Sequence, residues 1–280
     1  MAETLASRSM REVFSKFFAD RGTHLAAMIA YFALLSFVPL LFLALALLGF
    51  AGRADESSFL VKELKRDFPG TSVAEIVDLV RKVQHNAATL GIVGAAFLLW
   101  SALSLFSVLE SAFNIVYDRP NRSFLRGKAI AFGLMVGSLV TLFLSLLAGS
   151  FGAALLHHYA PGLLGNGILA YVLSAAVSAL GVFTFLFSVY YLLTNEELSL
   201  RDVLPGAVFA TIALELSFQV LPLFLHFARY NPTLQVFSGP AILLVWLYFM
   251  ANGIVLGAEL NWWWAQRRRQ QALDEGLGLA

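Results

Sequence analysis

Long apolar stretches separated by short polar segments dominate the chain. A helix of about 20 apolar residues is long enough to cross a hydrocarbon core of roughly 30 Å. Six stretches reach that length, and a lipid-exposed backbone satisfies its own polar groups by forming helices. The pattern therefore predicts an all-α, polytopic membrane protein with six transmembrane helices, at residues 26–50, 89–113, 129–156, 169–193, 203–227 and 239–264.

The first span is preceded by an amphipathic N-terminal segment, residues 1–25. Val13, Phe14, Phe17 and Phe18 recur at helical spacing, and basic residues lie off that face. The pattern predicts a helix that either lies on the membrane surface or packs as a cap on the bundle.

The longest hydrophilic connection, residues 51–88, follows the first span. It contains two apolar stripes at helical spacing, with Pro69 and Gly70 between them, which predicts two short amphipathic surface helices. The transmembrane domain then covers 26–265, and 266–280 form a basic C-terminal tail.

Two of the predicted spans contain an interior proline, Pro39 in the first and Pro222 in the fifth. Proline has no amide hydrogen, so each is predicted to break or kink its helix and to free one carbonyl. Tyr31 and Ser36 are the polar side chains near the first of these prolines.

Small residues are spaced as GxxxG at Gly133/Gly137 and again at Gly253/Gly257. This spacing lets two helix backbones approach closely. The contacts could lie within one chain or between copies, so a homo-oligomer is one of the alternatives.

The charge content limits the classes of partner. Only 13% of the residues are charged, about half the usual fraction of about 25%. The net charge of +1 excludes the clustered basic excess of a nucleic-acid-binding protein. The absence of cysteine excludes disulfides and thiolate metal sites. Membrane lipids are therefore the partners that the composition predicts.

Most of the 19 Lys and Arg residues lie on one predicted side of the membrane, in the N-terminal segment, the second and fourth loops and the C-terminus. Basic residues in short segments favour the cytoplasmic side, so both termini are predicted to be cytoplasmic. The basic residues of the first loop partly offset this bias.

Ionisable and amide side chains inside apolar spans are the candidate chemistry, because such groups are costly in a bilayer unless they face one another or a wet cavity. Glu215 is the principal candidate because it lies deepest in its predicted span. Interhelical hydrogen bonds, worth about 0.6 kcal/mol each, are the structural alternative. The candidate residues for a substrate or ion cavity are Glu215, Gln219, Glu110, Asn114, Glu259, Asn261, Tyr31 and Ser36.

Enzymatic chemistry finds little support. The run from Glu196 to Arg201 matches the EExxxR pattern of membrane CAAX-type proteases, but the histidines of that family are not matched. His157 and His158 have no further ligand nearby, so no metal site is predicted. We expect no catalytic residues, and no cofactor because no nucleotide-binding loop is evident.

Four blocks resemble the YihY/BrkB family of bacterial inner-membrane proteins: residues 25–41, 100–126, 198–207 and 242–261. The resemblance implies six transmembrane helices and an inner-membrane location. The family was formerly mislabelled ribonuclease BN. This chain departs from the pattern at residues 237–240, where relatives tend to have Tyr-Gly, so no role of that tyrosine is carried over.

Three functional hypotheses follow. The first is a transporter or flippase-like permease for a small polar or amphipathic molecule, with lipids among the candidates. The second is a non-catalytic membrane scaffold or envelope assembly factor. The third is an intramembrane hydrolase. A wet cavity that reaches one membrane face would favour transport, and a closed, dry bundle would favour a scaffold.

Overall fold

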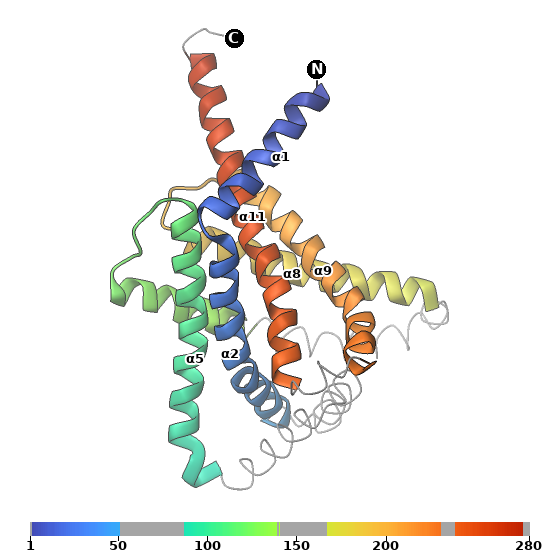
Figure 1. Cartoon of the computed structure of the whole chain (residues 1–280). Helices are drawn as coiled ribbons and strands as arrows, with labels where there is room; N and C mark the ends of the chain where they lie inside the picture. The colour runs from blue at the N-terminus through green and yellow to red at the C-terminus, as the bar shows by residue number, and fades with distance from the viewer. Residues whose placement is uncertain (1, 51–86, 139, 141–166, 231–238, 277–280) are drawn as a thin grey trace, which may run out of the picture.

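The computed structural model describes residues 2–50, 87–138, 140, 167–230 and 239–276 (Figure 1). Within these ranges every regular element is helical, which confirms the all-α prediction for this part of the chain. Residues 124–138 form one helix. The others are α1 (Ala2–Ala19), α2 (Gly22–Phe50), α5 (Ala87–Val116), α8 (Gly167–Leu193), α9 (Leu200–Tyr230) and α11 (Gly239–Gly276).

Four helices in the described part are long and apolar enough to cross a membrane: Leu99–Val116, Ala176–Leu193, Leu200–Leu221 and Ala241–Leu273. They correspond to the second, fourth, fifth and sixth predicted spans. A shorter apolar stretch, Gly22–Phe37, belongs to the first. These helices make the chain a polytopic membrane protein.

Several predicted features lie outside the described residues. They include most of the third span, His157 and His158, and the predicted surface helices of residues 51–88. The last helix is longer than its predicted span, because α11 continues to Gly276 through residues that were assigned to the basic tail.

Helix α11 lies at the centre of the bundle and packs against α9, α2, α1 and α5 (Figure 1). Both termini lie at the same end of the molecule, where α1 and the last turns of α11 extend beyond the bundle. We call this end the loop end, because residues 117–123 and 194–199 also connect their helices there. The position of both termini at one end is compatible with the predicted topology, and the side of the membrane on which they lie stays a prediction.

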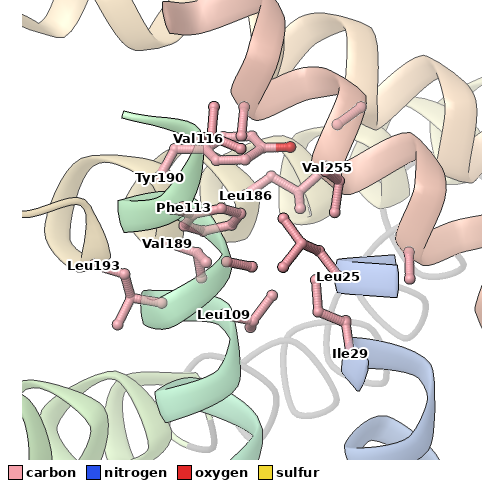
Figure 2. Packing of buried hydrophobic residues seen from close by; sticks show 14 of the residues in the cluster. Leu25, Ile29, Leu109, Phe113, Val116, Leu186, Val189, Tyr190, Leu193 and Val255 are labelled. Atoms are coloured by element: carbon pink, nitrogen blue, oxygen red, sulfur yellow. The ribbon is translucent and has the colours of Figure 1, made fainter. Parts of the chain in front are cut away.

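The apolar core draws residues from every helix of the described structure, and Figure 2 shows the part of it between α2, α5, α8 and α11. Tyr190 is buried there, with its ring centroid 5.0 Å from that of Phe113. Its hydroxyl donates a hydrogen bond of 2.7 Å to the carbonyl of Ile254. An unpaired hydroxyl would be costly in an apolar interior, so this bond lets a tyrosine occupy the centre of the core.

Glycines set the closest approach between α9 and α11. A Cβ atom on Gly206 would overlap the carbonyl oxygen of Gly257, and one on Gly257 would meet the hydroxyl of Tyr190. The GxxxG spacing at Gly253/Gly257 therefore serves a contact within the chain. At Gly133 and Gly137, by contrast, an added Cβ would meet nothing within 4 Å among the described residues. Close packing at this pair is therefore not seen in the described part of the chain, and a contact between copies of the chain stays a prediction.

We expect Gly206→Ala to destabilise the protein by about 1–3 kcal/mol, because the new methyl group must push two backbones apart. Thermal unfolding of the purified protein in detergent measures the effect. Gly133→Ala is the matched control, since its methyl group enters open space and should leave the melting temperature unchanged or slightly raised. Equal melting temperatures for the two variants would contradict the packing shown here.

The two interior prolines do not end their helices. Pro39 lies within α2 and Pro222 within α9, and both helices continue through them. The helices are therefore not interrupted at their prolines, and the predicted kinks stay a prediction. Each proline still lacks an amide hydrogen, which leaves one carbonyl of its helix without the usual partner.

Candidate functional site

The ammonium group of Lys16, on helix α1, reaches into the bundle. The Lys16 ammonium lies 3.4 Å from the Glu259 carboxylate of α11, whose side chain is fully buried. It also donates a 2.8 Å hydrogen bond to the carbonyl of Val116 at the end of α5. The same ammonium lies 4.4 Å from the ring centroid of Trp262, and it pairs with Asp20. One lysine thus connects α1, α5 and α11.

Sequence reasoning assigned Lys16 to the polar face of the N-terminal helix, and this was wrong. Val13 and Phe17 are buried, whereas Phe14 and Phe18 are exposed. Lys16 lies beside Val13 and Phe17 on the helical wheel, so its aliphatic stem can follow them inward. Only Val13 and Phe17 of the predicted four-residue apolar face therefore pack against the bundle. These two residues fit the hypothesis that α1 is a cap on the bundle.

Asn261 joins the last helix to the start of α9. Its Oδ1 accepts a 2.6 Å hydrogen bond from the amide of Gly206, and the residue is 1% exposed. Its Nδ2, like both carboxylate oxygens of Glu259, has no hydrogen-bond partner among the described residues. Buried polar atoms normally have partners. These groups therefore make the interior of this end unusually polar.

Arg122 fastens the loop of residues 117–123 to the end of α8. Its guanidinium donates hydrogen bonds of 2.6 Å and 2.8 Å to the carbonyls of Leu193 and Thr194. It also lies 3.5 Å from the buried carboxylate of Glu110. The last carbonyls of a helix lack intrahelical donors and carry partial negative charge, so an arginine stabilises them. Glu110 in turn balances the charge of the arginine.

Asn114 connects the same two loops by a second route. It is fully buried, and its Oδ1 accepts a 2.7 Å hydrogen bond from the amide of Asn195. Its Nδ2 donates to Asn121 at 3.0 Å. Asn195 donates from its own side chain to the carbonyl of Pro120 at 2.9 Å. Two loops that are far apart in the sequence are thus held as one unit.

Glu196 is held between two arginines, Arg119 and Arg269, at the surface of this unit. The carboxylate is 2.8 Å from Arg269. Partial burial disfavours the charged form of Glu196, but hydrogen bonds and charges from both arginines outweigh it and hold the pKa below its usual range. Glu196, the first residue of the EExxxR-like run, is therefore a paired anion.

A cavity of about 850 Å³ opens beside these residues at the loop end. Four guanidinium groups and two carboxylates line it, so its walls carry an excess of positive charge. The cavity draws on the loops of residues 117–123 and 194–199, on the helix of residues 124–138 and on α11. Its lining residues are Arg119, Pro120, Arg122, Arg126, Asn195, Glu196, Glu197 and Arg269.

The remaining predicted residues lie elsewhere. Glu215 is half-buried and accepts a 2.9 Å hydrogen bond from Ser178 of α8, and Gln219 is exposed. Ser36 is buried and donates to the carbonyl of Ser101 at 2.9 Å. Tyr31 is about half exposed.

The sequence predicted that Glu215 and Glu110 line the same cavity. In the structure their contacts involve different elements, since Glu215 bonds to Ser178 and Glu110 pairs with Arg122. Glu110 and Asn114 lie directly behind the walls of the loop-end cavity, through Arg122 and Asn195. Glu215 and Gln219 do not line this cavity. The group that the structure brings together is thus Glu110 and Asn114 with Arg122, a residue that the sequence analysis did not single out.

These features define a helical membrane protein with a charged cavity at one end of its bundle. The chain belongs to the family described as Virulence factor BrkB, whose model matches residues 13–277. It is 30% identical over 260 residues to the ribonuclease-like protein YfkH of Bacillus subtilis, covering 90% of this chain and 93% of the relative.

Two further relatives are named only as membrane proteins. A UPF0761 membrane protein of Chromohalobacter salexigens is 28% identical over 279 residues, which cover 96% of this chain and 66% of the relative. One from Pseudoalteromonas translucida is 29% identical over 249 residues, covering 86% of this chain and 81% of the relative. No solved structure matches. The blocks on which the resemblance rests contain Glu110, Arg122, Gly206 and Glu259, all described above.

Proposed function

We propose that this protein is a transporter or flippase-like permease for a small polar or amphipathic molecule. The observation that carries the proposal is the open, charged cavity of about 850 Å³ at the loop end. Arg122 connects this cavity to the buried carboxylate of Glu110, so the polar character continues from the surface into the bundle. Polar groups at such depth are costly, and in membrane proteins they mark substrate or ion pathways.

The proposal places the protein in the bacterial inner membrane with the loop end toward the cytoplasm. Support comes from the basic residues that gather at this end, among them Arg119, Arg122, Arg126 and residues 267–269. Basic residues close to helix ends favour the cytoplasmic side. We propose no catalytic role, since Glu196 of the protease-like run is already paired with two arginines.

Translocation in reconstituted vesicles tests the proposal. The full chain is incorporated into liposomes that contain fluorescent phospholipids, and dithionite then quenches the labels in the outer leaflet. We expect quenching beyond the outer-leaflet half in vesicles with protein and not in protein-free vesicles. In parallel, uptake of small radiolabelled solutes into the same vesicles tests whether the substrate is a small polar molecule instead. No translocation of any of these molecules by correctly folded protein would overturn the proposal.

A membrane scaffold is the second candidate, and a specific observation favours it. Polar side chains join helix to helix, as half-buried Glu215 does with Ser178 and buried Ser36 with the carbonyl of Ser101. Such bonds hold a bundle together without any substrate. The scaffold hypothesis predicts that Glu215→Ala leaves function unchanged, whereas changes at Phe59 and Phe68, outside the described residues, abolish partner binding.

A further inference from the structure

An apolar groove of about 760 Å³ runs along the side of the bundle. The helix of residues 124–138 and α8 form its walls, and α9 and α11 contribute to its floor. Its lining residues are Ile130, Gly133, Leu134, Gly137, Ser138, Gly181, Val182, Thr184, Phe185, Ser188, Leu192, Leu214, Phe218 and Met250. Nearly all of these residues are apolar or small, in contrast to the charged cavity.

One wall of the groove is a single helical stripe. Ile130, Gly133 and Gly137 lie three and four residues apart, so they occupy one face of their helix. Arg126 lies one turn before Ile130 on the same face and lines the charged cavity. This stripe therefore begins in the cavity and continues into the groove.

The opposite wall repeats this arrangement on α8. Gly181, Ser188 and Leu192 share one face of the helix and line the groove. Asn195, just beyond the end of α8, lines the charged cavity. Both walls thus pass from apolar to polar at the same end, which places the groove and the charged cavity one after the other along the same two helices. We call this succession the amphipathic path.

The length of the path matches one leaflet of a bilayer. From Arg126 to Gly137 a helix rises roughly 16 Å, and half of a hydrocarbon core of roughly 30 Å is roughly 15 Å. No described residue fills the groove beside its glycines, because an added Cβ at Gly133 or Gly181 would meet none of the described atoms within 4 Å. A flexible acyl chain fits a groove of this length and chemistry.

The charge at the head of the path is suited to an anion. Glu196 is already neutralised by Arg119 and Arg269. Arg126 is exposed and has no ion pair or hydrogen-bond partner among the described residues. Its neighbours Phe124 and Leu125 are 75% and 79% exposed, which suits a segment that lies in the membrane interface.

We propose that this path is a binding site for one anionic phospholipid, with the phosphate headgroup at Arg126 and the neighbouring arginines and an acyl chain in the groove. The proposal rests on the proposed transport function and specifies its substrate class. Arginine provides a fork of donors that matches phosphate, which explains why the head of the site is built from guanidinium groups. The apolar groove excludes a purely soluble anion as the complete ligand.

Photo-crosslinking of the full chain in nanodiscs tests this site. The probes are phosphatidylglycerol and phosphatidylcholine, each with a photoreactive group on its acyl chain, and labelled peptides are located by mass spectrometry. We expect phosphatidylglycerol to label the groove walls, residues 130–138 and 181–192, about tenfold more than phosphatidylcholine does. Arg126→Gln should reduce its labelling to the level of phosphatidylcholine.

The double variant Gly133→Leu/Gly181→Leu should reduce labelling of the groove by both lipids, because the new side chains fill it. Both positions face open space, so the variant should fold. The matched control is Val208→Leu, at an exposed position of α9 outside the groove, which should label as the unchanged protein does. Unchanged melting temperatures establish that each variant is folded.

Three results would overturn the site: equal labelling by the two lipids, labelling that is insensitive to the glycine variants, or displacement of the lipid by soluble glycerol phosphate alone. The vesicle assay separates this site from the transport function. Groove labelling without translocation would refute transport and leave the binding site. Translocation without headgroup preference or groove labelling would refute the binding site and leave the transport function.

Discussion

Replacing Lys16 by methionine should destabilise the protein by about 3–5 kcal/mol. The substitution keeps the length of the side chain but leaves the carboxylate of Glu259, which is fully buried, without its cation. It also removes the hydrogen bond to the Val116 carbonyl and the contact with the Trp262 ring. An uncompensated buried charge costs far more than an exposed pair contributes.

Equilibrium unfolding in mixed micelles measures this effect, and a double-mutant cycle assigns it. Glu259→Gln in the Lys16→Met background should restore part of the lost stability, because the buried charge is then gone. Arg11→Met, at an exposed position of the same helix, is the control and should change stability by less than about 0.5 kcal/mol. If Lys16→Met cost no more than this control, the buried pair would have no energetic role.

Replacing Arg122 by alanine should cost about 2–4 kcal/mol and release the loop of residues 117–123. Its guanidinium satisfies the terminal carbonyls at Leu193 and Thr194 and faces Glu110. All of these groups lose their partner at once. Arg122→Lys should recover only part of the loss, since an ammonium cannot reproduce the planar fork that reaches both carbonyls.

Hydrogen exchange distinguishes this local effect from a general loss of stability. Amides of residues 117–123 and 194–199 should exchange faster in Arg122→Ala than in the unchanged protein, while those at the centre of α11 should not. Arg126→Ala, in the same cavity but without a partner among the described residues, is the matched control. Uniformly faster exchange throughout the bundle would contradict a fastening role for Arg122.

Local sequence was sufficient to single out four of the buried polar residues. Glu110, Asn114, Glu259 and Asn261 interrupt apolar runs, and all four are buried in the structure. Their partners could not be found in the same way. Lys16 and Arg122 come from segments that read as membrane-external, and Arg122 meets carbonyls more than 70 residues further along the chain. No spacing rule connects residues that only the packing of helices brings together.

The glycines show likewise that spacing along the chain does not specify tertiary contacts. Gly133/Gly137 and Gly253/Gly257 have identical spacing, yet the second pair lies in a helix contact, whereas a Cβ added at the first meets no described residue within 4 Å. Spacing defines a face of a helix, but what covers that face depends on the position of every other helix. The groove that follows from the open pair therefore could not be predicted from the sequence.

By itself, the sequence determined the class of the protein and predicted its long apolar helices, four of which the described residues confirm as candidate membrane spans, because the cost of burying polar groups in lipid acts on each segment separately. The bias of basic residues toward one end was also present in it. The tertiary structure alone decided which charges are paired, which glycines are packed, and that a charged cavity and an apolar groove follow one another along the same helices. Those properties depend on distances between separate helices, which hydrophobicity along one segment does not specify.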